Sequence, residues 1–350
     1  MIRVAILGAG IGAQHFESYQ KLHSRFNVVS VIDQDEGKAR ALTKDTPTKA
    51  GARINEALED PSIDLIDICL PPHLHASVTL ETLARCKHVI CEKPLATSLK
   101  DVAAIKSAAQ RHNRRVYPVF QYRWGPGLAQ LRHVMLSGFA GQPTIAAAET
   151  HWNRGAEYYA IPWRGTWAGE QGGAVLGHAI HSHDLLAQIM GPVRAVAAST
   201  TTRVNRIETE DCAAITFEFA NGALGTSSVT LGSATDETRL RYVFEHVTAT
   251  SGTDPYCPGA GGWTFTARDP ARQEALEALL AEAPAEQPGF EGFLSAVAED
   301  LATGCSGAVR LQDGAASIEL VTAIYHAART GQRVRLPLAQ DHPLYGGWNP

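Results

Sequence analysis

What this 350-residue chain lacks excludes several classes of protein. Its cysteines are scattered and form no C-x-x-C pair: Cys69, Cys86, Cys91, Cys212, Cys257 and Cys305. That spacing argues against a disulfide framework and against a structural zinc site, and it indicates a reducing compartment. No apolar run approaches the length needed to cross a membrane.

Charge and chain ends exclude further classes. A formal net charge of −5 provides no excess of positive charge for nucleic acid or an anionic membrane. The first predicted strand begins at residue 2, which leaves no room for a signal peptide. The sequence has no internal repeat or low-complexity segment. We therefore expect a cytoplasmic protein without nucleic-acid or membrane partners, and the length predicts two domains.

What the chain does have is a glycine-rich turn between two apolar runs near its start. Ile2–Leu7 precedes the turn Gly8–Ala13 (GAGIGA), and a second apolar run, Val28–Asp33, ends in an acid. This order of strand, turn, helix, strand and acid is the dinucleotide-binding fingerprint in its G-x-G-x-x-A form. Gly8 permits the tight turn, and Gly10 lets the backbone approach a pyrophosphate at the helix N-terminus. The predicted cofactor contacts of the turn are Gly8, Gly10, Ile11 and Gly12.

Asp33 indicates which dinucleotide binds. A carboxylate at the end of the second strand accepts hydrogen bonds from a ribose 2′-hydroxyl and repels a 2′-phosphate. The next residue is Gln34, where a 2′-phosphate would favour arginine. Asp33 and Gln34 therefore predict NAD as the cofactor, while Lys38 and Arg40 leave NADP open.

The first 120 residues alternate strand-like and helix-like segments, which predicts a parallel sheet covered on both faces. The expected strands after Asp33 are 65–70, 88–92 and 115–120, and the expected helices are 36–43, 54–59, 74–85 and 98–112. The second half instead has antiparallel signals. Its expected strands are 144–152, 193–204, 211–219, 223–231, 240–250 and 262–267, and its expected helices are 127–137, 177–190, 289–303 and 312–330. Asn221-Gly222 predicts a hairpin turn.

The predicted fold class is therefore α/β. It has an N-terminal doubly wound parallel-sheet Rossmann domain and a C-terminal α+β domain with a broad, mostly antiparallel sheet. We place the NAD-binding domain at residues 1–121 and the substrate-binding and oligomerisation domain at 122–350. A broad sheet with one face uncovered by helices favours self-association into a dimer or tetramer.

At this point the chain resembles the Gfo/Idh/MocA family, the glucose–fructose oxidoreductase and inositol dehydrogenase type, over nearly its whole length. The resemblance rests on Gly8–Ala13, Pro71-Pro72-His73-Leu74-His75, Glu92-Lys93-Pro94, Gln171-Gly172-Gly173 with His181 and Asp184, and Gly331–Pro337. It implies an NAD-dependent sugar or cyclitol dehydrogenase. It also implies that Pro71 and His75 line the cofactor, that Glu92 contacts it or orients Lys93, and that Gln121, Trp163 and Arg164 approach it.

Lys93 is the predicted catalytic lysine. It follows a parallel strand, at the sheet edge where doubly wound folds bind their ligands. An ammonium group there can bond a substrate hydroxyl and stabilise negative charge on that oxygen during hydride transfer. The resemblance implies the same role, with Lys93 contacting both cofactor and substrate.

His181 is the second predicted catalytic residue, because imidazole titrates near neutral pH and can accept or donate the hydroxyl proton. Spacing predicts that His178, His181 and Asp184 share one helix face. Family members commonly carry Asp-x-x-x-His here, but the aspartate position is Gly177 in this chain. His178 is the candidate for an additional substrate contact. The same three side chains also raise a metal site, although hydride transfer in the family needs none, so we predict no metal.

Aromatic and polar residues are concentrated between positions 151 and 167: His151, Trp152, Asn153, Arg154, Tyr158, Tyr159, Trp163, Arg164 and Trp167. Flat rings stack on the C–H faces of sugars, and Arg, Asn and His bond to hydroxyls. Arg164 is suited to a substrate carboxylate, which adds sugar acids to the substrate classes. The predicted substrate-binding residues are Lys93, Arg123, His151, Tyr158, Arg164, His178 and His181.

Two other functions remain open at this stage. One is a glycosidase that uses bound NAD transiently to oxidise a sugar and labilise its glycosidic bond, which the glycine at position 177 makes conceivable. The other is a non-catalytic NAD-binding sensor, against which Lys93 and His181 argue.

Overall fold

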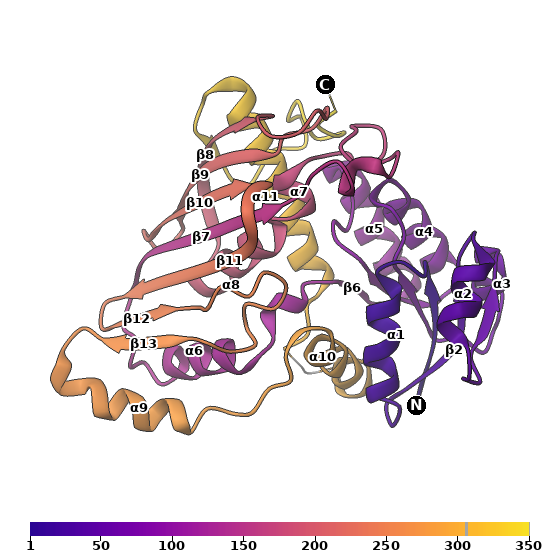
Figure 1. Cartoon of the computed structure of the whole chain (residues 1–350), viewed down its shortest axis with the longest axis horizontal. Coiled ribbons are helices and arrows are strands. Elements are labelled where there is room, and N and C mark those ends of the chain that lie inside the picture. Colours follow the sequence, from indigo (N-terminus) through magenta and orange to yellow (C-terminus); the bar gives the residue numbers. More distant parts are fainter. Residues whose placement is uncertain (305–306, 350) are drawn as a thin grey trace. The chain divides into compact units, whose positions relative to one another are not determined.

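Two sheets organise the chain in the computed structural model, which describes residues 1–304 and 307–349 (Figure 1). The five cysteines within these residues are all free thiols, and Cys305 lies outside them. The chain divides into two compact units. The first contains 1–119 and 293–318, and the second contains 120–292 and 319–350.

The first unit is built on six parallel strands in the order β3-β2-β1-β4-β5-β6. The strands are β1 Ile2–Leu7, β2 Phe26–Ile32, β3 Lys49–Gly51, β4 Leu65–Ile68, β5 His88–Cys91 and β6 Val116–Pro118. The helices are α1 Gly12–Lys21, α2 Glu36–Thr43, α3 Ile54–Leu58, α4 Pro72–Ala84 and α5 Leu99–His112. The strand order is that of a doubly wound dinucleotide-binding sheet, so this part of the predicted fold class is confirmed.

Local sequence explains the elements of this sheet. Every residue of β4 is buried, as expected for a strand covered on both faces. Ser98 caps α5 by accepting a hydrogen bond from the Asp101 amide, and Asn113 ends it in the left-handed region with φ of 50°. The buried Asp300 of α10 (Gly289–Thr303) accepts a 2.7 Å bond from the Tyr117 hydroxyl, which ties this helix to β6.

The second unit contains eight strands in the order β13-β12-β11-β7-β10-β9-β8-β14. They are β7 Pro143–Asn153, β8 Val193–Thr201, β9 Cys212–Phe219, β10 Leu224–Thr230, β11 Gly232–Phe244, β12 Val247–Thr250, β13 Thr264–Ala267 and β14 Val334–Arg335. Only β7 and β10 pair in parallel among these neighbours, so the predicted broad, mostly antiparallel sheet is confirmed. The helices are α6 Pro126–Leu136, α7 Ala174–Gly177, α8 Ile180–Met190 and α9 Gln273–Ala281, together with the part of α11 (Leu311–Thr330) that begins at Glu319.

Helix α8 covers one face of this sheet. Its Ser182 hydroxyl lies 3.0 Å from that of Thr150 in β7, and its His183 Nε2 lies 3.0 Å from the Ser227 hydroxyl in β10. His151, the neighbour of Thr150 along β7, bonds Ser228 on the opposite face. The alternation of side chains along each strand thus separates a helix-covered face from a second face.

Two predictions of secondary structure are wrong in detail. The expected strand 240–250 is the end of β11, a turn at Glu245-His246 and the start of β12, whose residues pair antiparallel. The expected helix 177–190 is interrupted after α7 and resumes at Ile180. His178 at the break has φ of −125° and ψ of −59°, outside the helical region. The Asn221-Gly222 hairpin is confirmed, with Gly222 at φ of 90°. Strands β3 and β14 and helix α9 were not predicted.

Among the residues that the structure describes, no helix combines the length and apolar character needed to cross a bilayer.

Candidate active site

The glycine-rich turn after β1 has the geometry that a dinucleotide requires. Gly8 has φ of 104°, and a Cβ there would lie 2.3 Å from the Cys69 carbonyl oxygen. A Cβ on Gly10 would meet nothing within 4 Å, so that side of the turn is open. Helix α1 has neither a capping side chain nor an acid in its first turn, which leaves its N-terminal amides and dipole to an anion. The turn therefore fits a pyrophosphate.

Asp33 is held at the end of β2 by the same turn. Its Oδ2 accepts a 2.8 Å bond from the Ala9 amide, and its Oδ1 accepts a 2.9 Å bond from the Asp35 amide. These bonds fix the carboxylate beside the glycine turn, the place from which it would receive ribose hydroxyls. Gln34, which follows it, is exposed.

Substituting the two glycines separates folding from cofactor binding. Gly8→Ala is expected to lower the free energy of unfolding by about 1–3 kcal/mol, because the residue has positive φ and its Cβ would meet a backbone oxygen. Gly10→Ala is expected to keep the melting temperature and to weaken NAD binding by about tenfold or more, because its methyl group fills the approach of the pyrophosphate. Thermal melts and NAD titration calorimetry measure both effects. Equal loss of stability in the two variants would contradict this assignment.

The loops after β4 and β5 are joined by His75. This buried imidazole places Nδ1 2.6 Å from the Pro94 carbonyl oxygen and Nε2 2.7 Å from that of Leu70. Burial lowers the pKa of His75, against the two carbonyl contacts, which favour the protonated ring. Pro71 is the N-cap of α4. His75 therefore holds the loop that carries Lys93 against the loop that carries Pro71.

A buried hydrogen-bond network that sequence reasoning missed leads to the Lys93 amide. His15 of α1 places Nδ1 2.8 Å from Asp67 of β4 and Nε2 3.1 Å from Glu92 Oε1. The second Glu92 oxygen accepts a 3.1 Å bond from the Lys93 amide. Burial opposes charge on His15, but the Asp67 carboxylate outweighs it, and the pKa of His15 lies well above its usual value. The charged imidazole of His15 lies between the carboxylates of Asp67 and Glu92 and thus fixes Glu92, the residue before Lys93.

Among the described residues, three members of this region have side chains of the kinds that bind metal ions and lie close enough to share one. His15, Asp67 and Cys69 are buried, and their donor atoms lie within 4.8 Å of one another. Burial raises the pKa of the Cys69 thiol, which keeps it protonated and a poor metal ligand. The charged His15 ring donates its Nδ1–H to Asp67 and its Nε2–H to Glu92, so hydrogen bonding explains these contacts.

In the second unit, His181 lies between aromatic rings of the segment that follows β6. Its ring stacks on Tyr122 with centroids 4.3 Å apart, and it meets Phe120 edge-on at 5.9 Å. One residue beyond Tyr122, Arg123 donates two bonds of 2.7 and 2.6 Å to the carboxylate of Asp184. Helix α8 and this segment therefore hold the imidazole in a defined orientation.

His178 has different neighbours, so the prediction of one helix face shared with His181 and Asp184 is wrong. Its ring meets Trp152 edge-on with centroids 5.2 Å apart and lies 5.7 Å from Tyr158. The reason is the break after Gly177, which takes His178 out of helical geometry. Arg164 stacks on the Tyr158 ring at 3.9 Å. His178, Tyr158 and Arg164 are thus brought together.

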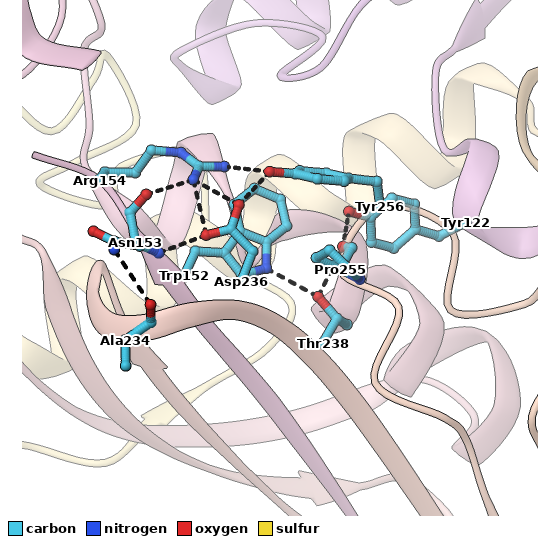
Figure 2. Close-up of polar contacts among 9 residues, drawn as sticks. All are labelled: Tyr122, Trp152, Asn153, Arg154, Ala234, Asp236, Thr238, Pro255 and Tyr256. Atoms are coloured by element: carbon cyan, nitrogen blue, oxygen red, sulfur yellow. Dashed lines mark hydrogen bonds and ion pairs between the residues drawn. The ribbon is translucent and has the colours of Figure 1, made fainter. Parts of the chain in front are cut away.

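Figure 2 shows how the Trp152 side of this cluster is fixed. Arg154 donates to Asp236 Oδ2 at 2.8 Å and to the Tyr256 hydroxyl at 3.0 Å, while its guanidinium lies over the Trp152 ring. The Trp152 indole donates a 3.1 Å bond to Thr238. The end of β7, the start of β11 and the loop that carries Tyr256 are therefore locked around Trp152.

Three other predicted site residues have surroundings of their own: His151, Gln121 and Trp163. His151 faces the opposite side of the sheet from Trp152, because neighbouring strand residues point to opposite faces. The Oε1 of Gln121 is buried and has no hydrogen-bond partner among the residues that the structure describes. Trp163 lies next to Arg164, whose guanidinium is 5.3 Å from the Trp163 ring.

Comparison with known proteins identifies both halves of the chain. Residues 2–120 match the model of the oxidoreductase family with an NAD-binding Rossmann fold, GFO_IDH_MocA, and residues 128–250 match the GFO/IDH/MocA C-terminal domain. The chain is 24% identical to inositol 2-dehydrogenase 2 of Saccharopolyspora erythraea over 98% of each sequence. It spans 63%, 65% and 58% of the length of the first curated relatives it matches.

Solved structures are similar over nearly the whole chain. The WlbA dehydrogenase from Bordetella pertussis, in complex with NADH and UDP-GlcNAcA, is 27% identical with a TM-score of 0.83, and the match covers 97% of this chain and 99% of that one. Levoglucosan dehydrogenase, in complex with NADH and levoglucosan, shares the fold at 19% identity with a TM-score of 0.80, covering 96% and 100%.

Proposed function

Because the chain belongs to the Gfo/Idh/MocA family of NAD-binding oxidoreductases, we propose that it transfers a hydride between a secondary hydroxyl carbon and NAD. The substrate is a sugar, a sugar acid or a cyclitol. One observation carries this proposal. The chain combines a glycine turn that can accept a pyrophosphate with a lysine, Lys93, whose loop is held by hydrogen bonds of Glu92 and His15.

Cofactor binding in this proposal follows from the first unit. Gly8, Gly10, Ile11 and Gly12 hold the pyrophosphate, and Asp33 receives the ribose hydroxyls. NAD, when bound, supplies the nicotinamide carbon that takes or gives the hydride. The bonds from the Ala9 and Asp35 amides keep the Asp33 carboxylate in place, so a 2′-phosphate would meet this carboxylate.

Lys93 and His181 handle the hydroxyl proton in this proposal. The Lys93 ammonium binds the reacting oxygen and stabilises the negative charge that develops on it. His181 accepts the proton during oxidation and returns it during reduction. The stack on Tyr122 supports this role, because it holds the His181 ring in one orientation.

The substrate side is formed by Tyr158, Arg164 and His178, with Arg123 as a further candidate. His151, which the sequence also predicted here, lies on the opposite face of the sheet and is not part of this proposal. A ring beside an arginine suits a sugar that carries a carboxylate, since the ring covers C–H groups and the guanidinium bonds the acid. The WlbA relative was solved with UDP-GlcNAcA, a nucleotide-linked sugar acid, which supports an acidic sugar as the substrate class.

The test is NADH formation at 340 nm with NAD and NADP in parallel. The substrate panel contains UDP-GlcNAcA, myo-inositol, levoglucosan, glucose and glucuronic acid. We expect a substrate-dependent rise with NAD for at least one acidic sugar or cyclitol. Tight NAD binding without NADH formation on any member of the panel would contradict the proposed dehydrogenase.

We further propose that the eight-stranded sheet supplies a self-association surface. Its face opposite α8 carries His151 and Ser228 together with exposed Ala214, Thr216 and Thr226. Small and hydroxyl side chains of this kind allow a second sheet to pack closely. Analytical ultracentrifugation at micromolar concentration is expected to show a dimer or tetramer, and a monomer alone would contradict the proposal.

A further inference from the structure

A buried carboxylate lies beside Gly177, the glycine that precedes the two site histidines. Glu170 is only 5% exposed, and its Oε1 would lie 3.5 Å from a Cβ built on Gly177. Apart from the neighbours of Gly177 in the chain and the backbone of its own helix, no other heavy atom of the described residues comes within 4 Å of that position. The space next to residue 177 is therefore bordered by a carboxylate that comes from elsewhere in the chain.

The Glu170 side chain is fixed. Its Oε2 accepts a 2.6 Å bond from the Gly165 amide, and its own amide donates a 3.0 Å bond to the Thr166 carbonyl oxygen. With one oxygen held by the backbone, the other is directed toward Gly177.

The negative charge of Glu170 acts on Tyr158, one of the rings next to His178. Burial first, and the negative charge of Glu170 second, raise the pKa of Tyr158 to about 12, against the opposing charges of Arg164 and Arg154. The Tyr158 ring lies 5.7 Å from that of His178. Glu170 is therefore part of the same electrostatic environment as Tyr158, Arg164 and His178.

We propose that Glu170 is the carboxylate of this site, a positioning residue that sets the orientation and charge of His178 and His181 in place of an acidic side chain at position 177. The inference rests on the proposed function, since His181 is the proposed proton carrier. It assigns Glu170, which follows an irregular loop, a role that no spacing in the sequence indicates. A carboxylate next to an imidazole stabilises the imidazolium and fixes the ring.

The test moves the carboxylate from one residue to the other. Glu170→Gln removes the charge and keeps the size, and Gly177→Asp in that background restores a carboxylate at the same place. Gly177→Asn in the Glu170→Gln background is the matched control, because it adds the same volume without the charge. The Cβ at position 177 meets only an ordinary contact, so the backbone accepts these side chains.

The first readout needs no substrate. In protein with ¹⁵N-labelled histidine at pH 7, the ring shifts of His178 and His181 report the imidazolium fraction. The other charged and titratable groups near these rings, Tyr122, Arg123, Asp184, Tyr158 and Arg164, are the same in all variants. We expect the imidazolium fraction to fall in Glu170→Gln, to recover with Gly177→Asp and to stay low with Gly177→Asn. Unchanged shifts in Glu170→Gln would overturn the inference.

The second readout is turnover of whichever panel substrate forms NADH. Glu170→Gln is expected to lower kcat by about 10²-fold with little change in KM, as for loss of support to an acid–base group. The relocated carboxylate is expected to recover at least about tenfold of this loss. Equal kcat in the Asp and Asn relocation variants would overturn the inference, whereas absence of turnover in the unmodified protein would overturn only the proposed function.

Discussion

Replacing Lys93 by methionine is expected to lower kcat/KM by about 10³-fold or more. The variant keeps the length of the side chain but removes the group that binds the reacting oxygen and stabilises its charge. NAD affinity is expected to change by less than about tenfold, because the glycine turn and Asp33 supply most of the cofactor contacts. Steady-state kinetics and NAD titration calorimetry measure the two effects separately.

Two further variants define what Lys93 contributes. Lys100→Met, at an exposed position at the start of α5, is the control for loss of a lysine and is expected to retain activity. Lys93→Arg keeps the positive charge but provides a group that does not deprotonate in proteins. Activity in Lys93→Arg near that of the unmodified protein would show that charge alone matters. Lys93→Met with more than a tenth of full activity would exclude Lys93 from the chemistry.

Replacing Asp184 by alanine is expected to lower the free energy of unfolding of the second unit by about 3–5 kcal/mol. The reason is that Arg123, whose side chain is only 11% exposed, would lose the carboxylate to which it donates two bonds. A loss of this size corresponds to a fall of roughly 10 °C in melting temperature for a unit of this length. Differential scanning calorimetry of the full chain measures it.

The controls for this prediction are a surface pair and a double replacement. Glu36→Ala breaks the exposed pair with Arg40 on α2 and is expected to change stability by less than about 0.5 kcal/mol. Arg123→Met with Asp184→Leu removes both buried charges and is expected to recover much of the loss. If Asp184→Ala is as stable as Glu36→Ala, the Arg123–Asp184 pair does not hold the segment with Tyr122 and Arg123 against α8.

How much the sequence reveals depends on how local each feature is. The glycine turn, Asp33 and the elements of the parallel sheet follow from short stretches of sequence, and the structure contains them nearly as predicted. The contact of Asp33 with the turn spans 24 residues, yet the fingerprint encodes it because one motif contains both ends.

The features that sequence reasoning missed come from several elements. His15, Asp67 and Glu92 are separated by up to 77 residues, and only the order of strands in the sheet brings them together. The signal in the sequence is a histidine two residues after the glycine turn, but it does not indicate its partners. Glu170 likewise has no visible relation to Gly177 until the loop is folded.

The error on His178 has a physical cause in one residue. The spacing rule assumes an unbroken helix, but α7 ends at Gly177, whose lack of a side chain weakens a helix interior. The two histidines consequently meet different rings, Trp152 and Tyr158 for His178 and Phe120 and Tyr122 for His181.

Isotope transfer tests the central claim most directly. A panel substrate that forms NADH is deuterated at its carbinol carbon, and the product NADH is analysed by NMR. The account predicts one deuterium at C4 of the nicotinamide for each substrate oxidised, no transfer in Lys93→Met or His181→Asn within the same time, and no label in water. Deuterium that remains in the product or exchanges into water while a glycosidic bond is cleaved would contradict it and would indicate transient redox chemistry instead.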